Sequence, residues 1–246
     1  MAGLLLGAYI TQAQIETMYS MYRLNPVISS PAFAGEVAQQ GEVTAMNRQQ
    51  WIGIQGAPRT MAFTGNFKWK AKTGLSFLAM SDIAGPMKIS TVAGDFAYQV
   101  KLNDAWKISG GVRLGASTLS LDYDGIQVVD PSDPVFAGDR STGIKFNTGW
   151  GVRLGNAKGF FVSISQPRVI GYDFGNVNGG YKDITYHYVN AGTTFRFSNT
   201  FALQPSFMAR VANEVPVSWD VNMNTLIGNA FEAGISYRHK DSFGAR

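Results

Sequence analysis

Apolar and polar residues alternate with a period of two along most of the chain after residue 41. The stretch 143–155 shows the pattern clearly, because its two alternating sets of residues differ sharply in character. One set is Ile144, Phe146, Trp150, Val152 and Leu154, and the other is Lys145, Asn147, Gly149, Gly151 and Arg153. Since successive side chains of a strand point to opposite faces, this pattern predicts a strand with one apolar and one polar face.

Alternation of this kind predicts eleven strands in the chain. They are residues 42–51, 60–70, 73–81, 89–102, 106–121, 143–155, 158–166, 181–198, 200–212, 215–227 and 229–238. Globular strands average about five or six residues, whereas a strand that spans a bilayer needs roughly 9–11. The lengths of the predicted strands therefore favour a membrane protein.

The links between the predicted strands alternate in length. The tight links are residues 71–72, 103–105, 156–157, 198–199 and 228–229, and the longer ones are 52–59, 82–88, 122–142, 167–180 and, less clearly, 213–214. Outer-membrane barrels combine short periplasmic turns with longer external loops. The chain is therefore predicted to be all-β, a transmembrane antiparallel up-and-down β-barrel in the bacterial outer membrane, with its N-terminus on the periplasmic side.

The structural alternative is a soluble sandwich, which would bury the apolar face against a second sheet. Alternation alone does not separate the two folds, but the order of the links favours the barrel. Composition also favours a membrane barrel. Only 15% of the residues are charged, 13% are aromatic, and the chain contains 28 glycine residues. A soluble domain usually carries about 25% charged residues. No stretch of 18 apolar residues follows residue 14, so no transmembrane helix is predicted.

The two ends of the chain have a character of their own. Residues 1–14, MAGLLLGAYITQAQ, are typical of the remnant of a signal peptide, with cleavage near Ala13 or Gln14. Residues 15–40 are expected to form a periplasmic or plug-like segment, and residues 41–246 the barrel domain. Eleven is an odd number and the final DSFGAR is not expected to form a closing strand. We therefore expect the barrel domain to be C-terminally incomplete and the full barrel to be larger and even-numbered.

Few residues are candidates for chemistry. Cysteine is absent, which excludes disulfides and cysteine-based metal sites, and the net charge of +4 comes without a basic run suited to nucleic acid. The two histidines, His187 and His239, have no Ser or Asp partner at a recognisable spacing, so no enzyme activity and no cofactor are expected. Asp130, Asp133 and Asp139 are weak candidates for a calcium site, with a solvated acidic loop as the alternative.

Charged residues on the polar parity are predicted to face the barrel interior. The basic ones are Lys68, Lys107, Arg113, Lys145, Arg153, Arg196, Arg210 and Arg238, and the acidic ones are Asp95, Asp220 and Glu232. A basic lumen could favour anions. A neutralised interior that is filled by side chains and conducts nothing is the reading that we favour.

Several motifs resemble the PorP/SprF family of the type IX secretion and gliding machinery. They are YSMYRLNPVISSPAFAG at 19–35, RQQWIGIQGAPRT at 48–60, SDIAGPMK at 81–88, DPSDPVFAG at 130–138 and SISQPRVI at 163–170. The motif residues to which the resemblance points are Asn25, Pro26, Pro31, Phe33, Gly35, Arg48, Trp51, Gly56, Pro58, Gly85, Pro86, Asp130, Pro131, Asp133, Pro134 and Phe136. The likeness extends over about residues 14–238, in the same order.

The resemblance implies a non-enzymatic outer-membrane component that supports export or surface attachment of a specific cargo, such as a large adhesin. It also implies a periplasmic peptidoglycan-binding protein or another machinery protein as a partner. The alternative function is a porin or transporter that passes small solutes through the lumen.

Overall fold

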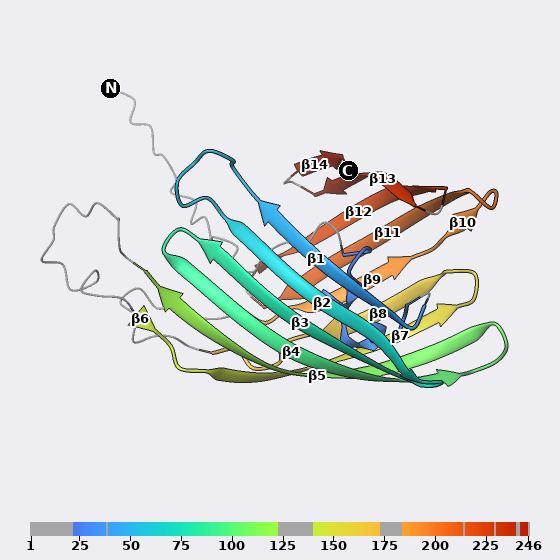
Figure 1. Ribbon diagram of the computed structural model, residues 1–246, viewed down its shortest axis with the longest axis horizontal. Coiled ribbons are helices and arrows are strands. Elements are labelled where there is room, and N and C mark those ends of the chain that lie inside the picture. The colour runs from blue at the N-terminus through green and yellow to red at the C-terminus, as the bar shows by residue number, and fades with distance from the viewer. Residues whose placement is uncertain are drawn as a thin grey trace, which may run out of the picture.

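The computed structural model describes residues 22–37, 39–122, 140–172, 184–213, 215–228, 230–239 and 242–245. They form one 14-stranded sheet in which every pair of neighbours is antiparallel (Figure 1). The long strands are β1 (Gly41–Gln49), β2 (Arg59–Lys70), β3 (Thr73–Ala84), β4 (Met87–Lys101), β5 (Trp106–Leu121), β7 (Lys145–Asn156), β11 (Phe201–Ala212), β12 (Val215–Ile227) and β13 (Phe231–Arg238). The shorter strands are β6 (Arg140–Ser141), β8 (Phe161–Gln166), β9 (His187–Gly192), β10 (Phe195–Arg196) and β14 (Ser242–Ala245).

The order of strands in the sheet follows the order of the chain, so the topology is up-and-down. The predicted all-β antiparallel architecture is therefore confirmed. In Figure 1 the sheet curls so that β1 and the β13–β14 pair lie on the same side of the molecule. Among the described residues no backbone pairing joins β1 to β14, so the curved sheet is an open barrel there. No helix in the described part of the chain is long and apolar enough to cross a membrane.

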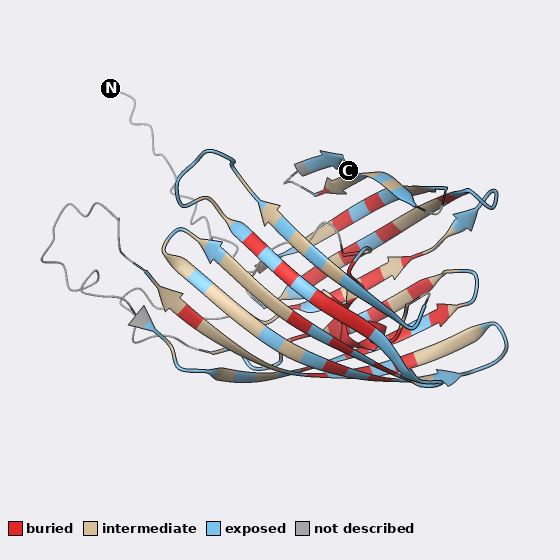
Figure 2. Cartoon of the chain, viewed as in Figure 1, coloured by how far each residue is buried: buried red, intermediate tan, exposed pale blue. Residues whose placement is uncertain are grey.

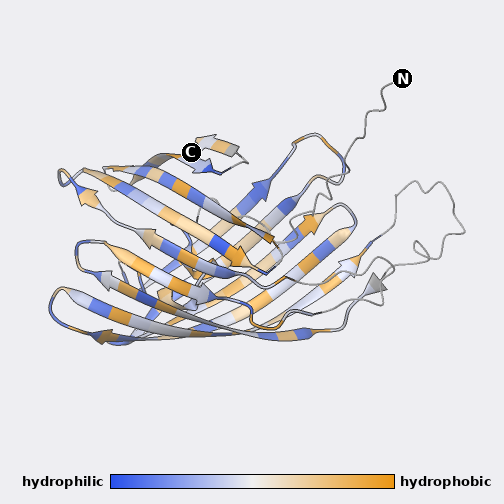
Figure 3. Ribbon diagram, turned by 180° about the vertical axis from the view of Figure 1, so that it is seen from behind, coloured by the Kyte–Doolittle hydropathy of each residue, from blue (hydrophilic) through white to orange (hydrophobic). Residues whose placement is uncertain are grey.

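The two faces of the sheet differ in the way that the alternation predicts, as the banding in Figure 2 and Figure 3 shows. On β2, Thr60 and Thr64 are buried on the inner face, while the outward Met61 and Phe63 are 49% and 43% exposed. On β5, Leu114 points outward and is 71% exposed. An outward apolar face of this kind is what a barrel presents to lipid.

The tight links lie together at one end of the sheet, which we call the turn end. They are the links 71–72, 102–105, 157–160, 197–200 and 228–230. The opposite end, which we call the loop end, holds the link 50–58 and the ends of β5, β7 and β8. One predicted long link is wrong. Instead of a loop over 82–88, β3 and β4 pair up to Ala84 and Met87, because Gly85 with φ +57° permits a two-residue turn.

Three further details differ from the predicted strands. The stretch 181–198 has a short β9 and a two-residue β10, and its residues 181–183 lie outside the described residues. The segment 158–160 is a turn, so β8 begins at Phe161. The chain end does form a strand, β14, whose Phe243 pairs with Tyr237 at a ring-centroid distance of 4.7 Å.

Residues 22–37, which we call the inner segment, lie against the inner face of the sheet at its turn end. They form two 3-10 helices, η1 (Pro26–Ile28) and η2 (Pro31–Phe33). Proline at the first position suits each helix, because it fixes φ and needs no hydrogen-bond partner there. The Ser30 Oγ accepts a hydrogen bond from the Ala32 N at 3.3 Å and so caps η2. In Figure 1 the segment is the blue coil enclosed by the sheet.

Candidate functional site in the barrel interior

Polar side chains of β2 hold the inner segment at both of its ends. The Asn25 Nδ2 donates to the Thr64 Oγ1 at 2.8 Å. The Asn66 Oδ1 accepts from the Gly35 N at 2.6 Å, and the Asn66 Nδ2 donates to the Phe33 O at 3.1 Å. A side-chain amide that pairs twice with one backbone segment satisfies groups that burial would otherwise leave unpaired.

Serine residues of β5 and β8 hold the middle of the inner segment. The Ser109 Oγ donates to the Ala32 O at 2.9 Å, and the Ser165 Oγ donates to the Ser29 O at 2.8 Å. The Ser30 and Ser163 hydroxyl oxygens lie 3.3 Å apart and share a hydrogen bond. The inner segment is therefore bonded to strands on several sides of the interior and not to one wall alone.

Small residues make the room that the inner segment occupies. A methyl group added at Gly111 on β5 would lie 2.6 Å from the Ala32 N and would also overlap the Pro31 carbonyl. One added at Gly74 on β3 would overlap the Ala34 carbonyl, and Gly35 faces it with φ +78°. Gly110, the residue before Gly111 on β5, points outward, and nothing lies within 4 Å of a methyl group built there. Close backbone approach thus requires glycine on the inner parity only.

Ion pairs neutralise most of the buried charge of the interior. The Arg113 Nε lies 2.6 Å from the Asp95 Oδ1, directly across the β4–β5 pair, and the Arg113 Nη1 donates to the Ile28 O at 3.0 Å. Arg113 also donates to the Val27 carbonyl. The same cross-strand pairing joins Arg238 to Asp220 at 2.5 Å on the β12–β13 pair.

The inner segment brings its own acid to two basic residues of the sheet. The Glu36 carboxylate lies 2.5 Å from the Lys107 Nζ and 3.2 Å from the Arg153 Nη1. Arg23 of the segment donates to the Thr194 Oγ1 at 2.9 Å and to the Gln204 Oε1 at 3.2 Å. Burial lowers the pKa of the Arg23 guanidinium, and the Glu232 carboxylate partly offsets that effect.

The predicted inward charges are found in two settings. Arg113, Arg153, Arg210, Arg238, Asp95 and Asp220 are buried in the interior. Lys107, Lys145 and Glu232 are half-buried, and Lys68 and Arg196 are exposed near strand ends at the turn end, where solvent reaches them. Strand parity placed the central residues well, but it carries no information about depth along the strand.

The N-terminal motif residues all lie in the inner segment or at its caps. Asn25 and Phe33 are buried, Pro26 and Pro31 begin the two 3-10 helices, and Gly35, with φ +78°, follows the C-cap of the second helix. The Phe33 ring meets the Phe161 ring edge-on at 5.4 Å, and the Arg153 guanidinium lies 5.3 Å from the Phe33 ring. These residues therefore fix the segment in the interior.

A second group of motif residues lies together at the loop end. The Gln50 N donates to the Pro58 O, the Gly85 N to the Gly56 O, and the Asp122 N to the Pro86 O, each at 2.9 Å. These bonds tie the link 50–58, the turn 85–86 and the end of β5 into one rim. Motif residue Arg48 is half-buried on the neighbouring β1.

Trp51 stands out in this rim. It is the one non-glycine residue with positive φ, 45°, among the described residues, and its side chain is 66% exposed. The neighbouring Ile52 is 83% exposed. A strained backbone that presents apolar side chains to solvent is typical of a contact surface.

The remaining candidates bear on metal binding and catalysis. Asp130, Pro131, Asp133, Pro134, Phe136 and Asp139 lie outside the described residues. Within the described ranges, no three His, Cys, Asp or Glu residues gather as a metal site would require. His187 is exposed at the start of β9, and His239 stacks on Trp219 at 4.7 Å.

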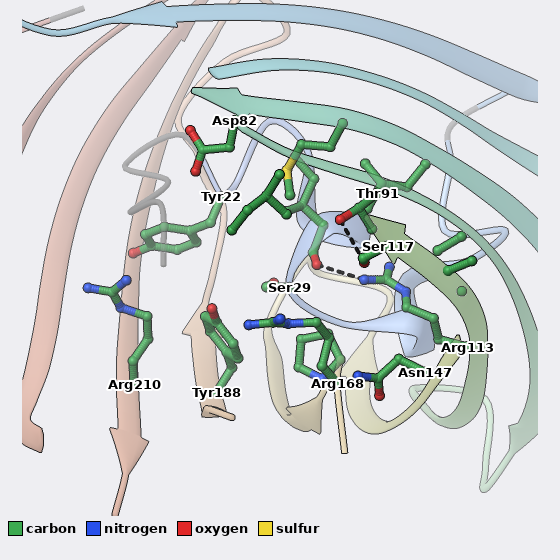
Figure 4. Close-up of a pocket in the computed structure, with 18 of the residues that line it drawn as sticks. Tyr22, Ser29, Asp82, Thr91, Arg113, Ser117, Asn147, Arg168, Tyr188 and Arg210 are labelled. Carbon is green, nitrogen blue, oxygen red and sulfur yellow. Dashed lines mark hydrogen bonds between the residues drawn. The ribbon is translucent and has the colours of Figure 1, made fainter. Parts of the chain in front are cut away.

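A pocket lies on the loop side of the inner segment (Figure 4). Ile28 and Ser29 of the segment are among its lining residues. Leu78, Met80 and Ile89 give it an apolar wall, while Arg113, Arg168, Tyr188 and Arg210 line it elsewhere. Sequence reasoning missed this pocket, because its lining comes from strands that are far apart along the chain.

Residues 11–245 match the family model described as type IX secretion system membrane protein PorP/SprF. No curated protein matches the chain.

Proposed function

Because this chain belongs to the PorP/SprF family of type IX secretion system membrane proteins, we propose that it is a non-enzymatic outer-membrane component of that system. In this role it supports the export or surface attachment of a specific cargo, such as a large adhesin. Its outward apolar face would contact the lipid of the outer membrane.

The filled interior is the observation that carries this proposal. Hydrogen bonds from β2, β5 and β8 and ion pairs from β5 and β7 fix the inner segment across the turn half of the sheet. We propose that the segment is a plug. A segment that is hydrogen-bonded to strands on several sides does not suit a static pore for small solutes, but it suits a protein whose partners bind at its two ends.

The two ends offer different partners a surface. With the short turns on the periplasmic side, the turn end would meet a periplasmic peptidoglycan-binding or machinery protein. The loop end would meet cargo outside the cell, and its rim already presents Trp51 and Ile52 to solvent. The joined backbones of 50–58 and 85–86 would hold that rim in one shape.

Gene deletion in the native organism tests the proposal. Surface proteolysis followed by mass spectrometry should show the loss of one or a few large surface proteins, restored by the wild-type gene, while small-solute uptake stays normal. The purified protein should show no steady conductance in planar bilayers. An unchanged set of surface proteins together with steady conductance would instead support the porin function.

A further inference from the structure

Four arginine side chains are buried in the interior, and three of them have a carboxylate partner. Arg113 pairs with Asp95, Arg153 with Glu36 and Arg238 with Asp220. The fourth, Arg210 on β11, is only 3% exposed and forms no ion pair with any described residue. Buried charges in proteins are normally paired, so Arg210 is an exception that calls for an explanation.

The contacts of Arg210 leave its charge uncompensated. Its Nη2 donates to the Ser218 Oγ at 3.0 Å, and its guanidinium lies 5.9 Å from the Tyr186 ring. Its Nε is buried and has no hydrogen-bond partner among the described residues. One neutral hydroxyl and one ring do not replace the water that a guanidinium loses on burial, so the residue is costly as it stands.

Arg210 lines the pocket on the loop side of the inner segment. Figure 4 shows it with Tyr188 along one wall, while Asp82 lies across the pocket. Asp82 is the one carboxylate of the described lining, and it accepts a hydrogen bond from the Thr60 Oγ1 at 2.8 Å instead of pairing with Arg210. The guanidinium therefore lines the pocket without an ion pair to Asp82 or to any other described acid.

The opposite wall of the pocket sets the character of a ligand. Leu78, Met80, Ile89 and Ala93 from β3 and β4 present methyl and thioether groups to the space. A small, strongly hydrated anion gains nothing from such a wall. A ligand that joins one anionic group to an apolar body uses both sides of the pocket, because a carboxylate matches the flat fork of a guanidinium.

We propose that this pocket is a binding site for a carboxylate attached to an apolar body, and that Arg210 is the residue that binds the carboxylate. Either a free carboxylic acid or an acidic peptide segment would supply that group. Arg210 would donate its unsatisfied Nε–H to a carboxylate oxygen, and the β3–β4 wall would hold the apolar part. The site would bind such a ligand with or without a role in export.

Unfolding of the full chain in a neutral detergent tests the site, with Arg210→Gln as the variant and Arg238→Gln as the matched control. Arg238 is also buried, but it has Asp220 and does not line the pocket. Without ligand, Arg210→Gln should unfold at an equal or higher urea concentration than the wild type, because it removes an uncompensated charge. Arg238→Gln should unfold at a lower one, because it strands Asp220.

Ligand addition should make the wild type unfold at a higher urea concentration than Arg210→Gln. Hexanoate should raise the wild-type and Arg238→Gln midpoints but not that of Arg210→Gln, and affinity for the variant should fall at least tenfold by calorimetry. Arg210→Lys, which keeps the charge, should bind hexanoate with intermediate affinity and guards against a misfolded glutamine variant. Hexanamide, which lacks the charge, and inorganic phosphate, which lacks the apolar body, should leave all midpoints unchanged.

A capped hexapeptide with one glutamate among leucines distinguishes the two sources of the carboxylate. Tighter binding of the peptide than of hexanoate identifies a peptide ligand, and the reverse identifies a free acid; both support the site. The proposal is overturned if neither probe binds, if phosphate binds as well as hexanoate, or if Arg210→Gln binds hexanoate like the wild type. It is equally overturned if Arg210→Gln without ligand is destabilised as much as Arg238→Gln.

Discussion

The interior of the sheet has a turn half and a loop half that are built from the same strands but solve the problem of burial differently. In the turn half, serine and glycine on the inner parity leave room for residues 22–37, which then accept hydrogen bonds from serine residues of the wall. In the loop half, Thr91, Ser117 and Asn147 line an open pocket instead. Glycine at the inner positions of the turn half therefore lets a second backbone approach the wall there.

The charges of the two halves differ in the same way. Glu36 of the inner segment neutralises Lys107 and Arg153 in the turn half, so the segment and the wall compensate each other. In the loop half, Arg210 forms no ion pair with any described carboxylate. In the turn half one acid of the inner segment thus serves two cations of the wall, whereas Arg210 in the loop half is suited to a ligand.

Removal of an acidic side chain from each half should give the largest difference in unfolding free energy between the two halves. Glu36→Ala leaves the buried Arg153 without its partner and should cost about 3 kcal/mol of unfolding free energy. Asp82→Ala in the loop half loses one hydrogen bond from Thr60 and should cost about 1 kcal/mol or less. Urea unfolding in detergent, followed by tryptophan fluorescence, measures both; equal costs would contradict the contrast.

A bulkier residue on each face of β5 should give the next largest effect. Gly111→Val collides with the backbone of η2 and should cost about 1–3 kcal/mol. Gly110→Val, one residue earlier, points outward into open space and should change stability by no more than about 0.5 kcal/mol. The same unfolding experiment checks the pair, and an equal loss at both positions would mean that the inner segment does not press on this strand.

Loss of a single polar side chain should give the smallest contrast. Asn66→Ala removes the two hydrogen bonds to Phe33 and Gly35 and should cost about 1–2 kcal/mol. Ser117→Ala removes one half-buried hydrogen bond with Thr91, 3.0 Å long, and should cost about 0.5–1 kcal/mol. Trypsin cleavage after Arg23 should become faster only in the Asn66 variant. Equal rates in both variants would mean that Asn66 does not hold the inner segment in place.

Alternation predicted the strands best where both faces are regular. The predicted 106–121 and 215–227 match β5 and β12 residue for residue, because apolar belts and polar interiors repeat there without interruption. It failed at 82–88, which it predicts as a loop although the backbones of Asp82, Ile83 and Ala84 still pair with β4. Hydropathy describes side chains, so it missed hydrogen bonding that the backbone continues on its own.

The site was less accessible to sequence reasoning than the fold. Prolines 26 and 31 indicate an irregular segment, but nothing in the alternation says that it lies against β2, β5 and β8, because those contacts depend on curvature of the whole sheet. One signal was present: serine and glycine recur on the inner parity at Ser109, Gly111, Gly151, Ser163 and Ser165. A run of small inward residues on neighbouring strands marks a surface that another backbone approaches.

Disulfide trapping tests most directly whether the inner segment occupies the interior of the assembled protein. The chain has no cysteine, so a pair introduced as Ser30→Cys and Ser163→Cys is the only one present. The two hydroxyl oxygens lie 3.3 Å apart, which suits a disulfide after small side-chain adjustments. We predict near-complete cross-linking of this pair in native membranes and none for Ser30→Cys with Ser117→Cys. Absent cross-linking at 30–163, or equal cross-linking of both pairs, would contradict it.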